Sequence, residues 1–468
     1  MSSVTRVMSR SHFFGRESQD DGAKWCVRSA VGYLRHLGMG NMPNVSHQGG
    51  VVSGESMRGL RVVELSEVWA GPFGCSLLGD LGADVIKLET YPRNSETRPL
   101  REPDPRVADG DGPVYERVNT HHHGNRNKRN IAVDIRTPEG AAILRRLIEW
   151  ADVLVESFSA GTIERMGFGW DAVHSINPRL TMVSLAGWGQ EGPYDGYIMF
   201  GVGFDAMTGH ASVRGYPDGT MENVIPILHS DATVPLAWIF GVVGALMERE
   251  RSGEGSYIDL AQIEELSTNV PQLIAEWTLN HRLPQRLGDS DPYMVPHGCY
   301  RAAGEDVWVN IAAQNDLQWA ALARVAGHPE WAEDGHSWAS VAGRVRERAA
   351  VDAAVGEYAA SADPWVIADA LQAFGVIAAP VLAPSDALLS PQLHAREWFQ
   401  TVDHPYLPDR LLGGFLWRMS PDGPAWDRRA ALLGEHNTEV LTGLGYSESE
   451  IEELRVASAI GDRYPDPV

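Results

Sequence analysis

Apolar residues between Gly59 and Leu185 follow two alternating patterns. Short β-branched runs, such as Leu60–Leu65 and Ala83–Leu88, are typical of buried strands. The segment Thr137–Trp150 instead has helical periodicity, with a threonine cap and an acidic first turn. The strand Leu60–Leu65, a helix at Phe73–Leu81 and the strand Ala83–Leu88 lie within thirty residues and form a crossover unit. Such a unit predicts a parallel sheet.

The alternation continues and predicts an open, Rossmann-like α/β sheet with helices on both faces. The further predicted strands are Ile131–Val133, Asp152–Glu156, Leu180–Leu185 and Tyr257–Leu260. The further predicted helices are Phe73–Leu81, Gly161–Met166 and Trp170–Ile176. The first turn reads SEVWAGPFG and contains no GxGxxG, so a nicotinamide cofactor has little support.

A second, smaller α+β domain is predicted inside the chain. Leu283–Gly298 is rich in Pro, Gly and Asp, Cys299–Ala303 and Val307–Ile311 form a predicted hairpin, and residues 314–375 are Ala-rich and helical. We therefore expect an N-terminal extension, a large domain built from both ends of the chain, and an inserted small domain. The expected ranges are 1–56, 57–282 with 386–468, and 283–385, respectively.

The composition limits which binding partners and which cellular compartment we expect. The 468 residues carry a formal charge of −23, which argues against nucleic acid or an anionic membrane as a general partner. Three scattered cysteines indicate a cytoplasmic protein without a disulfide framework. His121–His123 lack a second group of ligands, so we expect a solvated loop and no metal. No membrane span or secretory signal is expected.

Asp231 is the candidate catalytic residue. An apolar run, Val224–Leu228, is followed by the polar break His229–Asp231 and then by the apolar segment Val234–Met247. Asp231 therefore stands where a buried strand or extended segment gives way to a long helix. A helix cap explains this local pattern completely, because Asp and Ser side chains accept from unpaired backbone N–H groups. A catalytic role has to be supported by other parts of the sequence.

Several blocks of sequence, in the same order, resemble the class III CoA-transferases. They are GLRVVELSEVWAGPFGCSLLGDLGADVIKLE, NRNKRNIAVDIRTPEGAAILRRLIEWADVLVESFSAGTIERMGFGW, NPRLTMVSLAGWGQEGPY, the Asp231 stretch with ERERSGEGSYIDLA, and LLGEHNTEVL. The resemblance covers Gly59 to Tyr446. The family includes the formyl-CoA and carnitine CoA-transferases and the 2-methylacyl-CoA racemases. It implies an acyl-CoA:carboxylate CoA-transferase, with coenzyme A or acyl-CoA as substrate and no tightly bound cofactor.

The resemblance also implies roles for individual residues. Asp231 matches the nucleophile of the family, which attacks a thioester carbonyl and expels CoA thiolate. A second set matches positions that surround coenzyme A, and Arg165 among them matches a residue that meets the nucleotide phosphates. The set comprises Val68, Trp69, Ala70, Thr90, Lys128, Arg129, Val133, Ser157, Phe158 and Arg165.

The chain departs from the family at positions that bear on the substrate. Trp69 replaces the glutamine of formyl-CoA transferases, and LGDSDPYMVPHGCY stands in place of their glycine-rich loop, so oxalate or formate chemistry is not expected. Trp69 favours a bulkier acyl group, and a core role explains it equally well. Thr90 stands where many relatives have arginine. The histidine of the racemases corresponds here to Phe200 or Phe204.

Two alternatives to a transferase remain open on the sequence. In an acyl-CoA racemase Asp231 would act as an acid or base, and in a non-catalytic CoA-binding subunit it would have no chemical role. The expected partners are acyl-CoA and a carboxylic acid. The resemblance further implies an interlocked homodimer, or a heteromer with a paralogous subunit.

Overall fold

The fold is described from a computed structural model. It covers residues 56–101, 107–108, 110–225, 228–407 and 410–465.

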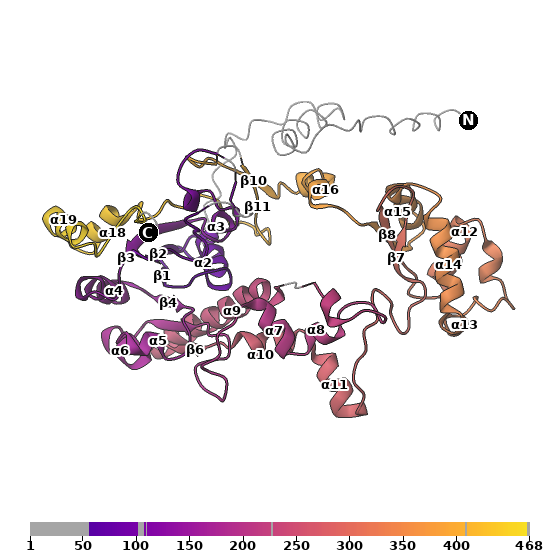
Figure 1. Ribbon diagram of the computed structural model, residues 1–468, viewed down its shortest axis with the longest axis horizontal. Coiled ribbons are helices and arrows are strands. Elements are labelled where there is room, and N and C mark those ends of the chain that lie inside the picture. The colour runs from indigo at the N-terminus through magenta and orange to yellow at the C-terminus, as the bar shows by residue number, and fades with distance from the viewer. Residues whose placement is uncertain (1–55, 102–106, 109, 226–227, 408–409, 466–468) are drawn as a thin grey trace. The chain divides into compact units, whose positions relative to one another are not determined.

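A six-stranded parallel sheet in the order β3-β2-β1-β4-β5-β6 forms the centre of the large domain (Figure 1). This order confirms the predicted Rossmann-like fold class, because it reverses direction between β1 and β4. The strands are β1 Arg61–Glu64, β2 Asp84–Thr90, β3 Lys128–Val133, β4 Val153–Glu156, β5 Thr181–Ser184 and β6 Tyr257–Asp259. β3 begins three residues earlier than predicted, because Lys128, Arg129 and Asn130 pair with β2 despite their polarity.

Successive residues of each strand supply two separate cores, as the alternation of side chains in a strand requires. Val63 and Leu154 face one side, while Val62 and Val153 face the other. The first core is covered by α4 Pro138–Trp150 and α6 Trp170–Ile176, with the C-terminal helices α18 Asn437–Gly443 and α19 Glu448–Val456. The second core is covered by α2 Ala70–Asp80 and α9 His229–Ser252.

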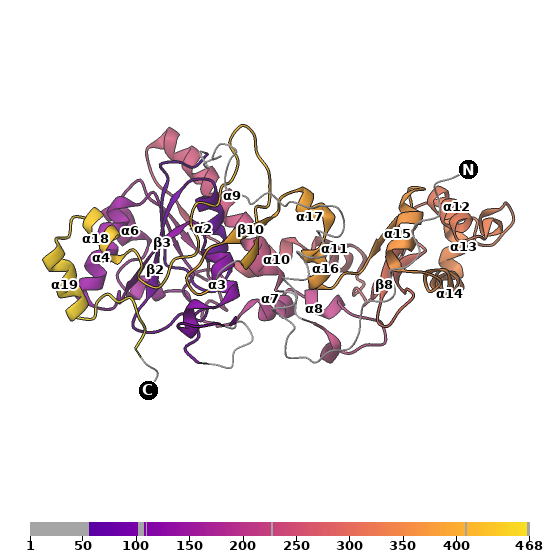
Figure 2. The same cartoon turned by 90° about the horizontal axis from the view of Figure 1, so that it is seen from above.

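The C-terminal segment completes the first core. Val440 and Ile451 are buried in the same cluster as residues of α4, and α18 and α19 lie beside α4 in both views (Figures 1 and 2). Ile460 then pairs antiparallel with Val133. The edge of β3 that faces away from β2 is therefore covered by residues near the end of the described chain.

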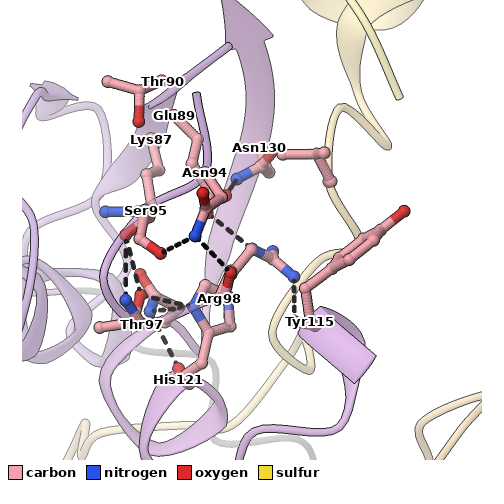
Figure 3. A network of polar contacts seen from close by, with 12 residues as sticks. Lys87, Glu89, Thr90, Asn94, Ser95, Thr97, Arg98, Tyr115, His121 and Asn130 are labelled. Atoms are coloured by element: carbon pink, nitrogen blue, oxygen red, sulfur yellow. Dashed lines mark hydrogen bonds and ion pairs between the residues drawn. The ribbon is translucent and has the colours of Figure 1, made fainter. Parts of the chain in front are cut away.

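Arg98, in the loop after β2, is the centre of a buried polar network (Figure 3). Its guanidinium pairs with Glu89 and with Glu116, each at 2.6 Å, and donates to the carbonyl oxygens of Tyr115 and Ala431. Burial alone would lower the pKa of Arg98, but the two carboxylates outweigh it and raise that pKa. The network joins the loop, the sheet and the C-terminal part of the chain.

Three further groups of elements lie outside this sheet and its covering helices. A three-stranded antiparallel sheet, β7-β8-β9, includes the predicted hairpin and packs with helices around a core of its own. Its elements are β7 His297–Arg301, β8 Trp308–Ala312, β9 Ile377–Pro380, α12 Asp316–Val325, α13 Val341–Arg346, α14 Arg348–Ala359 and α15 Pro364–Gln372. Leu382–Arg396, with α16 Pro384–Leu388 and α17 Pro391–Ala395, belongs to a separate unit. β10 Phe399–Val402 and β11 Arg410–Gly413 form an antiparallel pair.

One expectation from the sequence is wrong. His121 and His122 are not in a solvated loop: they are buried in α3 Asn119–Gly124, where the His122 ring lies edge-on to His404. α9 is long and apolar enough to cross a membrane by length and composition, although no such segment was expected. Its charged residues are confined to its two ends. It nevertheless buries Val234, Trp238 and Val242 in the second core, as a core helix does.

Candidate functional site

The turn after β1 lies at the point where the strand order reverses, which is where open α/β sheets bind ligands. Glu67 connects this turn to both neighbouring strands. Its backbone N–H donates to Ser157 Oγ at 3.1 Å, just beyond β4, and its carboxylate accepts from Thr90 Oγ1 at 2.8 Å, at the end of β2. The structure thus brings together Val68, Thr90 and Ser157 at the carboxyl edge of the sheet.

Two non-glycine residues near the predicted site adopt left-handed backbone conformations. Val68 has a φ of 69° in the turn after β1, and Leu228 has a φ of 54° at the N-cap of α9. Such a conformation is a genuine outlier for a β-branched residue and costs on the order of 1–3 kcal/mol. Strain of this kind concentrates where backbone geometry matters for binding or chemistry.

Trp238 couples the turn after β1 to α9. The indole is fully buried, its Nε1 donates to the Ala70 carbonyl oxygen at 3.2 Å, and its ring lies against Gly74. A Cβ on Gly74 would lie 2.2 Å from the ring, so only glycine allows this approach. The predicted CoA-binding turn and the helix that begins near Asp231 are therefore parts of one packed unit.

Asp231 lies in the first turn of α9 and does not cap it. The N-cap is Leu228, and no side-chain hydrogen bond caps the helix. Among the described residues no hydrogen bond to the Asp231 carboxylate is found. Residues 226 and 227 lie outside the described residues; the described residues Val224, Ile225 and Leu228 are in no strand, and the side chain of Ile225 is 79% exposed. The capping role that explains the local sequence is thus not performed.

The carboxylate of Asp231 is accommodated by the start of α7 Gly201–Met207. A Cβ built on Gly201 would lie 2.5 Å from Asp231 Oδ2. One turn further along α7, the buried Asp205 pairs with Arg214 at 2.8 Å and lies 3.4 Å from His210 Nδ1. Burial, and to a smaller extent the negative charge of Asp205, raises the pKa of Asp231 to about 6.

We expect Gly201→Ala to reduce turnover by about 100-fold, because the added methyl group displaces the Asp231 carboxylate by about an ångström. Steady-state kinetics with an acyl-CoA donor and a carboxylic acid acceptor measures the effect. Gly244→Ala is the matched control: it is a helical glycine of α9 with open space at its Cβ position, so activity should be retained. Equal losses in the two variants would contradict a specific role for Gly201.

The rate should fall as the pH drops through about 6, because protonation removes the charge of the Asp231 carboxylate. In Asp205→Asn the acidic limb should move to lower pH, since a negative neighbour that favours protonation is gone. The pKa of Asp231 in this variant should still be above that of an ordinary aspartate, because burial is the larger cause of its raised pKa. A pH profile of kcat/KM for both proteins tests this, and an unmoved limb in the variant would contradict the coupling.

The other predicted CoA-binding residues fall into two groups. Trp69 is half-buried at the N-cap of α2, and Phe158 is partly buried on the first core. Arg165 is exposed at the end of α5 Thr162–Arg165, folded back over Gly161 and bonded to Thr162 Oγ1 at 2.8 Å. These three, with Ala70, lie on elements that follow the carboxyl ends of β1 and β4.

Lys128, Arg129 and Val133 are placed differently. The Lys128 ammonium is fully buried and pairs with Glu64 at 2.7 Å, and it also donates to the Pro72 carbonyl oxygen. Arg129, at the opposite edge of the sheet, pairs with Asp84 at 2.7 Å. Val133 is buried in the first core. Lys128 therefore meets the turn after β1 only through buried contacts with Glu64 and Pro72, while the side chains of Arg129 and Val133 lie away from that turn.

The sequence reading missed three residues of the site. Gly201 and Asp205 lie within MFGVGFDAMTG, where a buried acid in an apolar run was the available signal. Glu156, at the end of β4, is fully buried, and its Oε2 accepts from the Phe158 N–H at 2.7 Å. Burial raises the pKa of Glu156 to about 7. Its place inside a strand that is otherwise apolar was the corresponding signal.

The fold is an open α/β sheet whose strand order reverses between β1 and β4, next to the candidate site. The chain belongs to CoA-transferase family III, which it matches over residues 57–437. It is therefore an enzyme that transfers coenzyme A.

Three relatives illustrate the similarity. The succinyl-CoA–D-citramalate CoA-transferase of Chloroflexus aurantiacus is 32% identical over 86% of this chain and 97% of the relative. The succinyl-CoA–L-malate CoA-transferase β subunit of the same organism is 32% identical over 85% and 96%. A crystal structure of a CaiB/BaiF family protein from Brucella suis is 30% identical, covers 83% of this chain and 99% of that one, and superimposes with a TM-score of 0.74.

Proposed function

We propose that the protein is an acyl-CoA:carboxylate CoA-transferase in which Asp231 is the covalent nucleophile. The observation that carries the proposal is a carboxylate in the first turn of α9 that caps no helix, accepts no hydrogen bond from a described residue and has a raised pKa. Above pH 6 it is ionised and poorly solvated, which favours attack on carbon. The names of both curated relatives pair a CoA thioester with a carboxylic acid, which supports the same reaction.

In the first half-reaction an Asp231 oxygen attacks the carbonyl carbon of the acyl-CoA thioester. The carbon–sulfur bond breaks, and coenzyme A leaves as the thiolate. The product is a mixed anhydride between Asp231 and the acyl group. The thiolate then attacks the Asp231 carbonyl carbon, which releases the acyl group as a carboxylate and leaves an aspartyl-CoA thioester.

The second half-reaction runs the same chemistry in reverse with the acceptor. The acceptor carboxylate attacks the aspartyl-CoA thioester, which expels the thiolate and forms a new anhydride. The thiolate attacks the acyl carbon of that anhydride, so the new thioester forms and Asp231 returns to a carboxylate. No oxidant, reductant or net proton is required.

Trapping of the intermediate tests the proposal. The protein is incubated with a panel of acyl-CoAs, treated with hydroxylamine or borohydride, and digested for mass spectrometry. We expect an adduct on the peptide that contains Asp231. Exchange of the substrate α-proton with solvent in the absence of an adduct would instead indicate a racemase.

Coenzyme A is proposed to bind at the carboxyl edge of the sheet, with Arg165 meeting its phosphates. Arg165 suits this role because it is exposed and makes no ion pair among the described residues, while a guanidinium presents a planar fork of donors. For Lys128, Arg129 and Val133 the geometry supports structural roles. We also propose domain boundaries at residues 57, 283 and 386. The proposed location of the protein is the cytoplasm.

An assembly of two subunits, homodimeric or with a paralogous partner, is also proposed. Leu236, Phe240 and Met247 lie along one side of α9 and are 46%, 83% and 71% exposed. An apolar stripe of this kind is usually covered by another subunit. The relative named as a β subunit supports the heteromeric form.

A further inference from the structure

Arg214, close to Asp231, has a guanidinium whose donors are mostly unused. It follows α8 His210–Val213 directly and donates from Nη2 to Asp205 Oδ2 at 2.8 Å. Its Nε and Nη1 are buried and have no hydrogen-bond partner within the described ranges. The side chain is still 15% exposed, so it lies at the edge of the solvent. Buried charged donors without a partner are costly, and their presence points to a missing acceptor.

The position of Arg214 relative to Asp231 is fixed by α7. Gly201 lies against the Asp231 carboxylate, and Asp205, four residues later on the same helix, holds Arg214. One helical turn rises about 5.4 Å. The Asp205 carboxylate that holds Arg214 therefore lies about one turn, roughly 5 Å along α7, from the contact with Asp231. That separation suits a molecule whose two ends reach Asp231 and Arg214 together.

Other groups around Asp205 favour an anion at this place. His210 lies 3.4 Å from Asp205 Oδ1, and the ring of His229 lies edge-on to that of His210. The hydroxyl of Ser230 and the indole nitrogen of Trp188 are also buried without a partner. Trp188 contacts Phe204, the neighbour of Asp205. Potential donors thus predominate on this side of Asp231, and Asp205 is the acceptor that they flank.

We propose that Arg214 binds the second carboxylate of a dicarboxylic substrate, so that the enzyme transfers coenzyme A between dicarboxylic acids. The inference rests on the proposed function, because Asp231 reacts with the first carboxyl group or its thioester. Asp205 orients the guanidinium and balances its charge while the site is empty. The reacting end of the diacid then meets Asp231, and the far end takes the unused N–H groups of Arg214.

A carboxylate fits this site better than a phosphate of coenzyme A. The planar fork of an arginine matches a carboxylate with two parallel hydrogen bonds. Because Asp205 already balances the single positive charge of Arg214, a group with one negative charge is repelled less than a more highly charged phosphate. If Arg214 were only the counter-ion of Asp205, its Nε and Nη1 groups would be expected to pair with other acceptors.

The test compares diacids and monoacids of equal chain length as acceptors. Succinate and butyrate, then glutarate and valerate, are assayed with wild type and Arg214→Met. Wild type should prefer each diacid. In the variant kcat/KM for diacids should fall about 10- to 150-fold, the effect of a lost charge-assisted hydrogen bond, while the values for monoacids change by less than about threefold. Arg214→Lys should restore only part of the preference, because it lacks the fork.

Arg286→Met is the matched control. Arg286 holds the same segment through the carbonyl oxygens of Ser212 and Gly219 and has no described role at Asp231. Its loss should affect diacids and monoacids alike. Equal losses for both acid classes in Arg214→Met would overturn the proposal. So would an unchanged preference in that variant, or no preference in wild type.

Direct binding separates this inference from the proposed function. Succinate should raise the melting temperature of wild type, but not of Arg214→Met, and butyrate should raise neither. If no acyl-CoA gives an adduct on Asp231 while succinate still binds through Arg214, the transfer mechanism fails and the diacid site stands. If the adduct forms and succinate stabilises both proteins equally, the diacid site fails and the mechanism stands.

Discussion

Asp231→Asn is expected to lower CoA transfer by about 10³-fold or more, because the amide cannot attack a thioester as a carboxylate does. The same change should stabilise the folded chain at neutral pH. The pKa of Asp231 rises from 3.8 to about 6 on folding, so the folded state binds this proton more tightly than the unfolded state. Stability therefore falls as the pH rises through that window. Asparagine removes the penalty, a gain of about 1–2 kcal/mol above pH 6.

Urea titrations at pH 7.5 and pH 4 measure this gain, which should disappear at the lower pH. Asp171→Asn is the control, because Asp171 is an exposed aspartate in the first turn of α6. It should keep full activity and show no comparable gain. Retention of transfer activity in Asp231→Asn would indicate that the chain is a non-catalytic subunit and would end the case for a covalent nucleophile.

Arg98→Met is expected to cost about 3–5 kcal/mol of stability, because it leaves Glu89 and Glu116 buried without their shared cation. Whole domains are stable by only about 5–15 kcal/mol, so much of the protein should unfold at a markedly lower urea concentration. The midpoint of urea unfolding, followed by circular dichroism, measures the effect.

Arg93→Met provides the comparison within the same loop. Arg93 pairs with Glu67 at 3.4 Å, but its side chain is 57% exposed. An exposed pair of this kind contributes about 0–1 kcal/mol. If both variants were destabilised to the same extent, the buried network in Figure 3 would not be what holds this loop.

Most of the large sheet could be predicted from the sequence because its central strands, β1, β4 and β5, are largely apolar and buried. The periodicity of Leu60–Leu65 and Asp152–Glu156 reflects burial on both faces, which the parallel order requires. The prediction was wrong where burial depends on distant partners. His121 and His122 are polar by type, and their burial depends on contacts such as that of His121 with Thr97 and those of His122 with the His404 ring and the Glu116 carbonyl oxygen.

The site could be predicted only where chain order and spatial order coincide. Val68, Thr90 and Ser157 follow strand ends, and parallel strands bring such ends to one edge. Lys128 and Arg129 begin β3, so the same rule places them at the other edge. Gly201 and Asp205 act on Asp231 through the packing of α7 on α9, which no local pattern in the sequence records.

The last described residues of the chain cover β3, and this has a consequence for the order of folding. Val440, Ile451 and Ile460 fill a core whose other walls come from residues synthesised several hundred positions earlier. During translation α4 and α6 can cover part of this core early, but the part that Val440, Ile451 and Ile460 fill stays open until the chain is almost complete. Such long loop closures slow folding. Apolar surface that is exposed in this way is prone to aggregate, so the C-terminal helices also protect the finished chain from association through this core.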